Sequence, residues 1–295
     1  MKTTLSPKEL GAAIGVSESS LKRWADTGRL HVARTAGGHR RIQLAEAVRF
    51  IRESGFAVER PDLLGLDDLA EIEPGGRTED VAAQFHDALL EGQAERARGL
   101  VLSLYLDGTA VSQLADRVIA PAMGRIGARW QHGPEGIFFE HRASDICDQA
   151  LNRLRGLLPA AEAAPVAVGA GPEDDPYVLP SLMAATVLAT EGWSEVSLGA
   201  YTPVHVLARA AADCEARLVW LALSVERSPG GNAELVRALA AGLRAAGSDA
   251  RVVVGGPGVS AERPPAVAGA YFAGSMSELA AFAQGLRTAA TDATP

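Results

Sequence analysis

Five consecutive residues near the N-terminus, Gly37-Gly38-His39-Arg40-Arg41, carry groups that can bind phosphate. The Gly-Gly pair predicts the turn of a hairpin between two short extended segments. Glycine lets the backbone approach a phosphate closely, and an arginine guanidinium offers paired donors that match phosphate oxygens. Taken alone, the segment is explained equally well as a basic hairpin exposed to solvent. The candidate contacts here are Thr35, Gly37, Gly38, His39, Arg40 and Arg41.

The residues before this hairpin predict two short helices joined by a tight turn. Ser6, Pro7 and Glu9 begin the first helix with a capping box, and Gly15 ends it. Ser17 caps the second helix. The pattern is typical of a helix-turn-helix, whose second helix enters the major groove of DNA, so it favours a DNA-binding region. The candidate contacts on this helix are Ser19, Ser20, Lys22 and Arg23.

The charge of the chain is unevenly distributed. The net charge is −8, which by itself argues against a nucleic-acid partner. Residues 1–55, however, hold ten Lys/Arg and five Asp/Glu, so their net charge is +5 and that of residues 56–295 is −13. A basic segment joined to an acidic remainder indicates a nucleic-acid module attached to a region with another role.

Composition excludes several classes of protein. No run of about 18 apolar residues occurs, so no membrane span is expected. The N-terminus lacks the apolar stretch of a signal peptide, which favours the cytoplasm. Two cysteines supply neither a disulfide framework nor a zinc site of four thiolates. The six histidines are scattered. We therefore expect no enzyme, no catalytic residue and no metal site built from side chains.

A second group of candidate residues lies in a helical stretch. Apolar residues recur at helical spacing over 78–160, with a kink or break expected at Pro121, and predict a bundle of four antiparallel helices. Trp130 is followed, after nine residues, by the pair Glu140-His141. The residues alone favour a plain interpretation, with the aromatic side chains in the core and the pair on the surface. The candidate ligand contacts are Trp130, Phe138, Glu140 and His141.

The last third of the chain, residues 165–295, alternates apolar strands with amphipathic helices. That order predicts a parallel, doubly wound, Rossmann-like sheet, which binds ligands beyond the carboxyl ends of its strands. The loops expected at those ends contain polar side chains and glycines. The candidate ligand contacts there are Asp175, Tyr177, Thr202, Ser224, Gly255 and Gly256.

About the first 52 residues resemble the winged-helix DNA-binding domain of the MerR family. In that family a recognition helix with a Leu-Arg-Arg-Trp-like sequence precedes a Gly-Gly-His-Arg-Arg wing. The corresponding segments here are Leu21-Lys22-Arg23-Trp24 and Gly37-Gly38-His39-Arg40-Arg41. The resemblance implies that the second helix and the wing contact double-stranded DNA.

The helical stretch resembles the CarH-like photoreceptor repressors, which carry a Trp-x9-Glu-His signature. In them a helical bundle caps the upper face of cobalamin. The resemblance implies that Trp130 packs beside the adenosyl group, that Glu140 and His141 contact it, and that Phe138 helps to close the pocket. One position departs from the pattern: the CarH type has a histidine directly after the tryptophan, where this chain has Gln131, with His132 next.

The α/β region resembles cobalamin-binding Rossmann-like domains, with another departure. These domains carry Asp-x-His-x-x-Gly after the first strand, whose histidine is the lower cobalt ligand. Here Asp175 is kept, Tyr177 replaces the histidine and Pro180 replaces the glycine. The resemblance also implies that Ser224 and the pair Gly255-Gly256 house the nucleotide tail. A phenol, with a pKa near 10, is a poor cobalt ligand at neutral pH, so binding through a protein lower ligand is not expected.

Several ligands stay open at this point. Adenosylcobalamin is implied by the resemblance and could keep its own base. The cleft could instead hold a bilin, a haem or no ligand at all. In some proteins a tyrosine phenolate binds the haem iron. The residues support equally well the alternative that Tyr177 is a packing residue at an empty or repurposed cleft.

These expectations give a multidomain chain: a winged helix-turn-helix (α+β), a linker, a four-helix bundle and a Rossmann-like α/β domain of the cobalamin-binding type. The ranges are 1–55, 56–77, 78–160 and 165–295. The resemblance implies a transcriptional regulator, of the repressor type, in which a ligand held between bundle and α/β domain changes oligomerisation and operator binding, with or without light. A homodimer or homotetramer is expected, because one winged helix covers little DNA.

Two other functions remain. The chain could be a regulator without a ligand, whose degenerate cobalamin domain serves oligomerisation or binds an antagonist protein. It could also be a corrinoid protein of the methyltransferase type, because a bundle followed by a Rossmann-like fold occurs in those systems. The basic N-terminal region, the absence of a substrate barrel and the loss of the lower-ligand histidine at Tyr177 weigh against this last function.

Overall fold

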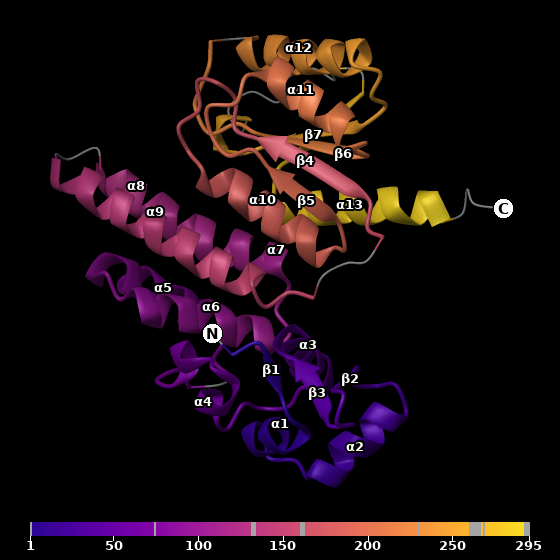
Figure 1. Ribbon diagram of the computed structural model, residues 1–295. Coiled ribbons are helices and arrows are strands. Elements are labelled where there is room, and N and C mark those ends of the chain that lie inside the picture. The colour runs from indigo at the N-terminus through magenta and orange to yellow at the C-terminus, as the bar shows by residue number, and fades with distance from the viewer. Residues whose placement is uncertain are drawn as a thin grey trace. The chain divides into compact units, whose positions relative to one another are not determined.

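The computed structural model describes residues 2–73, 75–130, 134–159, 163–228, 230–259, 267 and 269–291. The chain divides into two compact units, Met1–Ala160 and Ala161–Pro295, and each is described by itself (Figure 1). Within the described residues, no helix is long and apolar enough to cross a membrane.

The N-terminal part of the first unit contains the predicted helix pair and hairpin. Ser6 caps α1 with the predicted capping box, because its hydroxyl accepts from the Glu9 amide and Glu9 accepts from the Ser6 amide. The three strands form one antiparallel sheet in the order β1-β3-β2. The elements are β1 (Thr4–Leu5), α1 (Pro7–Ala13), α2 (Glu18–Asp26), β2 (Ala33–Arg34), β3 (Arg40–Gln43) and α3 (Leu44–Ser54).

Residues 56–77, expected as a linker, are folded against the rest of the first unit. They contain α4 (Pro61–Leu64) and the 3-10 turn η1 (Asp67–Leu69). Asp68 accepts from Arg98 on α6 and Arg153 on α9, each at 2.9 Å. The signal for this packing in the sequence is weak, because only scattered leucines such as Leu64, which is fully buried, mark the segment as apolar.

The helical region of the first unit follows the predicted pattern. Helix α9 packs against α6 and α8, and α5 packs against α6. Pro121, where a kink or break was expected, lies in the first turn of α8, directly after a five-residue π-helical segment. The helical assignment continues through the proline without a break. The elements are α5 (Thr78–Glu91), α6 (Ala94–Leu106), α7 (Val111–Leu114), η2 (Ala115–Ile119), α8 (Ala120–Trp130) and α9 (Pro134–Arg155).

Helix α3 is fastened to this helical region by one side chain. Arg52 donates to the carbonyls of Gly108 at 3.0 Å, Thr109 at 2.9 Å and Tyr105, at the C-terminal end of α6. Its guanidinium also lies over the Tyr105 ring, 4.3 Å from the centroid. Carbonyls at a helix C-terminus lack partners within the helix and favour a cation, so Arg52 supplies both the donors and the charge.

The second unit is a parallel five-stranded sheet in the order β5-β4-β6-β7-β8, which confirms the predicted α/β fold. Figure 1 shows α11 and α12 on one face of the sheet and α10 on the other. The elements are β4 (Val166–Ala170), α10 (Leu179–Thr190), β5 (Ser194–Ser197), α11 (Val204–Asp213), β6 (Leu218–Ala222), α12 (Gly231–Ala245), β7 (Arg251–Gly255), η3 (Pro257–Val259), β8 (Ala270–Ala273) and α13 (Met276–Thr291).

Candidate functional site

The predicted DNA contacts on α2 extend from its first turn, with Ser19 and Ser20, to its last turn, with Arg23. The Ser17 hydroxyl accepts from the Ser20 amide at 3.2 Å and lies 2.9 Å from the hydroxyls of Ser19 and Ser20. Lys22 is exposed and pairs with Glu18 at 2.7 Å, a contact that solvent screens. Arg23 is also exposed, and its side chain makes no hydrogen bond or ion pair with any residue described. The two basic side chains are therefore positioned to bind an anion.

The two arginines of the hairpin differ in their contacts. Arg41 is exposed, and within the described part of the chain its side chain has no polar partner. Arg40 instead donates to the Lys22 carbonyl at 2.8 Å and to the Asp26 carboxylate at 2.6 Å, and its side chain is 18% exposed. Arg40 therefore fixes the hairpin against α2, and its contact with DNA stays a prediction. Thr35, Gly37, Gly38 and His39 are exposed at the tip.

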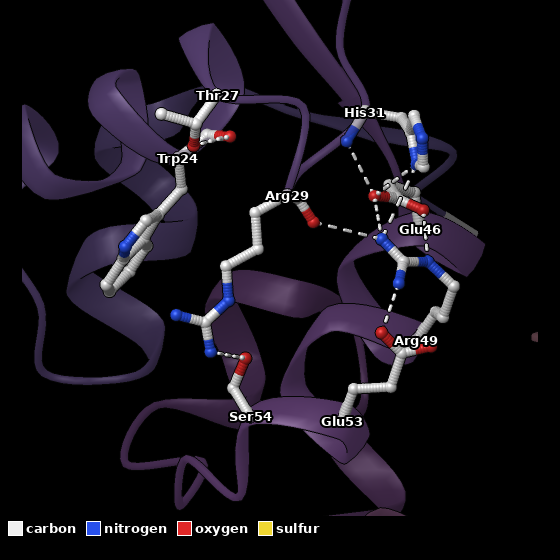
Figure 2. Close-up of polar contacts among 8 residues, drawn as sticks. All are labelled: Trp24, Thr27, Arg29, His31, Glu46, Arg49, Glu53 and Ser54. Atoms are coloured by element: carbon white, nitrogen blue, oxygen red, sulfur yellow. Dashed lines mark hydrogen bonds and ion pairs between the residues drawn. The ribbon is translucent and has the colours of Figure 1, made fainter.

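A polar network that sequence reasoning missed holds the segment between α2 and the hairpin (Figure 2). Glu46 on α3 accepts from Arg49 at 2.6 and 2.7 Å and from the His31 amide at 2.7 Å. Arg49 also donates to the Arg29 carbonyl at 3.3 Å and pairs with Glu53. Burial opposes ionisation of Glu46, but the bonds from Arg49 and His31 outweigh it and hold its pKa below the usual range.

An aromatic cluster supports the same segment from the other side. Trp24 on α2 lies 5.4 Å from Phe50 and 5.7 Å from Phe56, measured between ring centroids. The Arg29 guanidinium lies 5.4 Å from the Trp24 centroid and donates to Ser54 at 3.3 Å (Figure 2). The recognition-helix candidate is therefore fixed on α3 by aromatic packing.

The predicted ligand contacts of the helical region gather at the N-terminal half of α9. Phe138 is 58% exposed and Phe139 37%, and their rings meet edge to face at 5.5 Å. Glu140 lies 3.2 Å from the Ser144 hydroxyl and 3.5 Å from His141, which is exposed. The Trp130 side chain, Gln131 and His132 lie outside the described residues. Exposed aromatic rings beside a carboxylate and an imidazole form a surface suited to a flat, partly apolar ligand.

Arg142, which the sequence did not single out, supports this aromatic pair. Its guanidinium lies 4.8 Å from the Phe138 centroid and 5.3 Å from that of Phe139. It also donates to the Leu90 carbonyl and packs on Gly92, where an added Cβ would lie 3.0 Å from the guanidinium. The glycine at the end of α5 therefore makes room for the arginine that holds the two rings.

In the second unit, Asp175 is a structural centre at the carboxyl ends of the strands. Its side chain is fully buried and accepts from the amides of Tyr177 at 3.2 Å, Val225 at 3.3 Å and Ser224. Its carbonyl accepts from the Tyr201 amide at 3.1 Å. These bonds join the loops that follow β4, β5 and β6. The predicted ligand contact is thus used by the chain itself.

Three further predicted contacts lie against the chain's own backbone. Thr202 is 7% exposed, and its hydroxyl donates to the carbonyls of Leu198 and Ala200 at 3.4 and 3.3 Å. Gly256 has φ +114°, and an added Cβ would lie 2.3 Å from the Leu223 carbonyl oxygen. At Gly255 the nearest atom would be the Ala273 oxygen, at 3.1 Å. Neighbouring backbone therefore requires glycine at Gly256, whereas a side chain at Gly255 would need only a small shift of the Ala273 carbonyl.

Two tyrosines remain exposed on these loops. Tyr177 is 43% exposed and Tyr201, which the sequence did not single out, is 62% exposed. Tyr201 has φ +53°, an uncommon conformation for a residue with a side chain. The Ser224 hydroxyl is buried and lacks a hydrogen-bond partner among the described residues. The two phenols are therefore accessible to a ligand at this edge of the sheet.

The helical region can now be compared with known proteins. Residues 81–155 match the family model of the B12 binding domain. The match covers α5 to α9 and includes Phe138, Glu140 and His141. No curated protein matches the chain significantly in sequence.

The chain is also similar to solved structures of other proteins. A monomethylamine corrinoid protein from Methanosarcina barkeri is 17% identical with a TM-score of 0.55, and covers 71% of this chain and 100% of its own. A cobalamin-binding protein from Desulfitobacterium hafniense DCB-2 is 18% identical with a TM-score of 0.35, and covers 72% and 98%. The methanol:cobalamin methyltransferase complex MtaBC from M. barkeri is 15% identical with a TM-score of 0.37, and covers 94% and 93%. The first similarity shows a shared fold.

The residues of the two units fit a corrinoid unequally. The B12-type helical domain presents exposed aromatic rings, a carboxylate and an imidazole. In the α/β unit, the position of the expected lower ligand holds the Tyr177 phenol, and the Asp175 carboxylate that would orient an imidazole is saturated by backbone amides. Among the described residues, no group of three His, Cys, Asp or Glu could hold a metal ion. The α/β unit therefore offers a phenol, and no imidazole, at the position of the expected lower ligand.

One buried carboxyl of the B12-type domain makes its stability depend on pH. Burial, together with the nearby Asp145 charge, raises the pKa of Asp148 from 3.8 to about 6. The folded state therefore holds a proton that the unfolded state has released between about pH 4 and 6, so stability falls as pH rises through that window and stays lowered above it. We expect Asp148→Asn to remove this dependence and to raise the unfolding free energy at pH 7.5 by about 1–2 kcal/mol.

The measurement for Asp148 is urea unfolding between pH 4 and 8, followed by helical circular dichroism. Asp145→Asn is the matched control: that residue is exposed and acts on Asp148 only through its charge, so its effect is expected to be smaller. A stability of Asp148→Asn at pH 7.5 equal to or below that of wild type would contradict the prediction.

Proposed function

We propose that this chain is a DNA-binding transcriptional regulator, of the repressor type, that senses a corrinoid or another flat tetrapyrrole. Its helix pair and hairpin form a winged-helix DNA reader, and its B12-type domain supplies the ligand-sensing surface. The active form is a homodimer or homotetramer on a double-stranded operator, and the ligand, with or without light, changes its assembly. The chain has no catalytic role in this proposal.

The observation that carries the proposal is the presence of both features in one chain. Residues 81–155 match a B12-binding family, and a basic N-terminal region presents Arg23 and Arg41 without partners among the described residues. Arg40 and the Glu46–Arg49 network hold the two cations on fixed elements rather than on free loops. Preorganised cations on a helix and an adjacent hairpin are typical of DNA readers and have no evident use in a carrier of methyl groups.

The position of Arg52 suggests how the two features communicate. It connects α3, which carries the aromatic and polar supports of the DNA-reading elements, to the end of α6 in the B12-type domain. Asp68 makes a second connection, from the folded 56–77 segment to Arg98 and Arg153. In the proposed function, these contacts orient the DNA reader according to the state of the helical domain.

The ligand is identified by an absorption spectrum of the full chain after mixing in the dark with adenosylcobalamin, haem or biliverdin, followed by gel filtration before and after illumination. We expect one of the three to be retained with a colour that co-elutes with protein, and the apparent size to change when the ligand or light is added. Elution without any of the three would contradict the sensing part of the proposal.

A regulator without a ligand is the second candidate function. Its support is specific: Asp175, Thr202 and Gly256, three of the predicted ligand contacts of the α/β unit, are used by the chain's own backbone. In that case the α/β unit would act in oligomerisation or in binding an antagonist protein. The same gel filtration separates the two candidates, since this one predicts a stable oligomer whose size none of the three compounds changes.

A further inference from the structure

An indole fills the layer between the central strands of the parallel sheet and helix α10. Trp220 on β6 is 2% exposed, and its ring lies on Gly169 of the neighbouring strand β4, where an added Cβ would be 1.9 Å from a ring atom. Its Nε1 donates to the hydroxyl of Ser181 on α10 at 3.0 Å. Ser181 is fully buried. The indole is therefore held by close contact on one face and by a hydrogen bond at its edge.

The Trp220 indole resembles the base of the cobalamin nucleotide in shape. An indole and a benzimidazole are both a six-membered ring fused to a five-membered ring that contains nitrogen. Gly169 is the last residue but one of β4 and pairs with Trp220 at the middle of β6, and Ser224 and the Gly255-Gly256 pair follow at the carboxyl ends of β6 and β7. A base that reached inward from those loops, into the layer between the sheet and α10, would meet the indole.

The entrance from the loops is filled as well. The Asp175 carboxylate binds the amides of Ser224 and Val225, which draws the loop after β6 onto the loop after β4. An added Cβ on Gly258 would lie 2.5 Å from the Val225 carbonyl oxygen, so backbone already lies against that glycine. The Asn232 amide adds a bond of 2.9 Å to the Gly258 carbonyl. The space that these glycines would leave for the nucleotide tail of a ligand is therefore filled by the chain's own backbone.

We propose that Trp220 is a built-in occupant of the space that a nucleotide base would need, so the α/β unit accepts corrinoids without inserting their tail. Ligands of this unit are then corrin or porphyrin-like rings held at the outer loops, and cobalamin keeps its own base on cobalt. The chain consequently does not distinguish cobalamin from cobinamide, which lacks the nucleotide. The corrinoid part rests on the proposed function, whereas the filling of the layer does not.

The filling is tested with free 5,6-dimethylbenzimidazole as the probe, by calorimetric titration and thermal unfolding. We expect no binding to wild type, and binding to Trp220→Val with a rise in its unfolding temperature, because an empty buried cavity accepts an apolar ring of matching size. Trp220→Ala is the second variant. Trp193→Val is the matched control, since Trp193 is equally buried before β5. Binding to wild type, binding to the control as tight as to Trp220→Val, or no binding to either folded Trp220 variant would overturn the proposal.

The consequence for ligands is tested with the full chain, cobalamin and cobinamide. We expect the affinities of wild type for cobalamin and cobinamide to agree within about threefold. Bound cobalamin should show the spectrum of the form that carries its own base on cobalt. Trp220→Val is expected to bind cobalamin more tightly than cobinamide. A preference of wild type for cobalamin of tenfold or more, with its base released from cobalt, would overturn the proposal. If wild type binds neither corrinoid, the corrinoid form of the proposed function fails, and the benzimidazole experiment still decides whether the layer is filled.

Discussion

Replacement of Arg41 by alanine is expected to weaken DNA binding about tenfold or more while leaving the fold intact. Arg41 is exposed on β3, and its side chain binds no residue that the structure describes, so its charge is available to a phosphate or a base edge. Loss of one such contact costs about 1–3 kcal/mol of binding and, for a phosphate contact, lowers the salt dependence by about one ion. Arg23→Ala on α2 is expected to act in the same direction.

Arg40→Ala is the matched comparison, because Arg40 neighbours Arg41 but binds the Lys22 carbonyl and the Asp26 carboxylate. We expect it to lower both DNA affinity and the unfolding temperature of the N-terminal region, and Asp26→Ala to share part of this effect. A double variant of Arg40 and Arg41 would mix the two causes. Fluorescence anisotropy with DNA selected by wild type, at several salt concentrations, measures binding. Unchanged affinity of Arg41→Ala would contradict the assignment of the hairpin as a DNA-contacting wing.

Asp175→Asn is expected to destabilise the loops of the α/β unit by about 3 kcal/mol. The carboxylate is buried and accepts from three backbone amides, and hydrogen bonds to a charged group contribute about 1.5–3 kcal/mol each. An asparagine amide group would place an N–H against one of these donors. Hydrogen exchange should therefore become faster at Tyr177, Ser224 and Val225, and also at Tyr201, which binds the Asp175 carbonyl.

Asp174→Asn is the control for that experiment. Asp174 is adjacent in sequence, but its side chain is 52% exposed and pairs with Arg227, so its loss is expected to cost under about 1 kcal/mol. If Asp175 instead served a ligand, its replacement would impair ligand binding and leave exchange in these loops unchanged. That result would contradict the structural role assigned to Asp175.

The elements of both units could be predicted because local rules govern them. Ser6 and Glu9 form the capping box that the sequence indicates, and alternation of apolar strands with helices was sufficient for the parallel sheet. The packing of residues 56–77 could not be predicted, because it depends on Asp68 meeting Arg98 and Arg153, which are 30 and 85 residues away.

The candidate sites show the same division. Arg41 is exposed on the predicted hairpin. Phe138 is exposed too, whereas the residues alone favoured a place for it in the core of the bundle. The tasks of Arg40 and Asp175 depend on backbone groups that other parts of the chain bring near, and no residue type in the sequence marks a backbone carbonyl or amide as a partner. Trp220 reads as an ordinary core residue of a strand, and only its contact with Gly169 shows what space it fills.

The central claim joins ligand sensing to DNA binding in one chain. Its most direct test is the affinity of the full chain for DNA selected by wild type, measured with and without the retained tetrapyrrole, in the dark and after illumination. The proposal predicts at least a tenfold change in affinity between two of these states, and loss of all binding in Arg23→Ala/Arg41→Ala. The same affinity for DNA in every state, under conditions in which the tetrapyrrole is bound, would contradict the proposal.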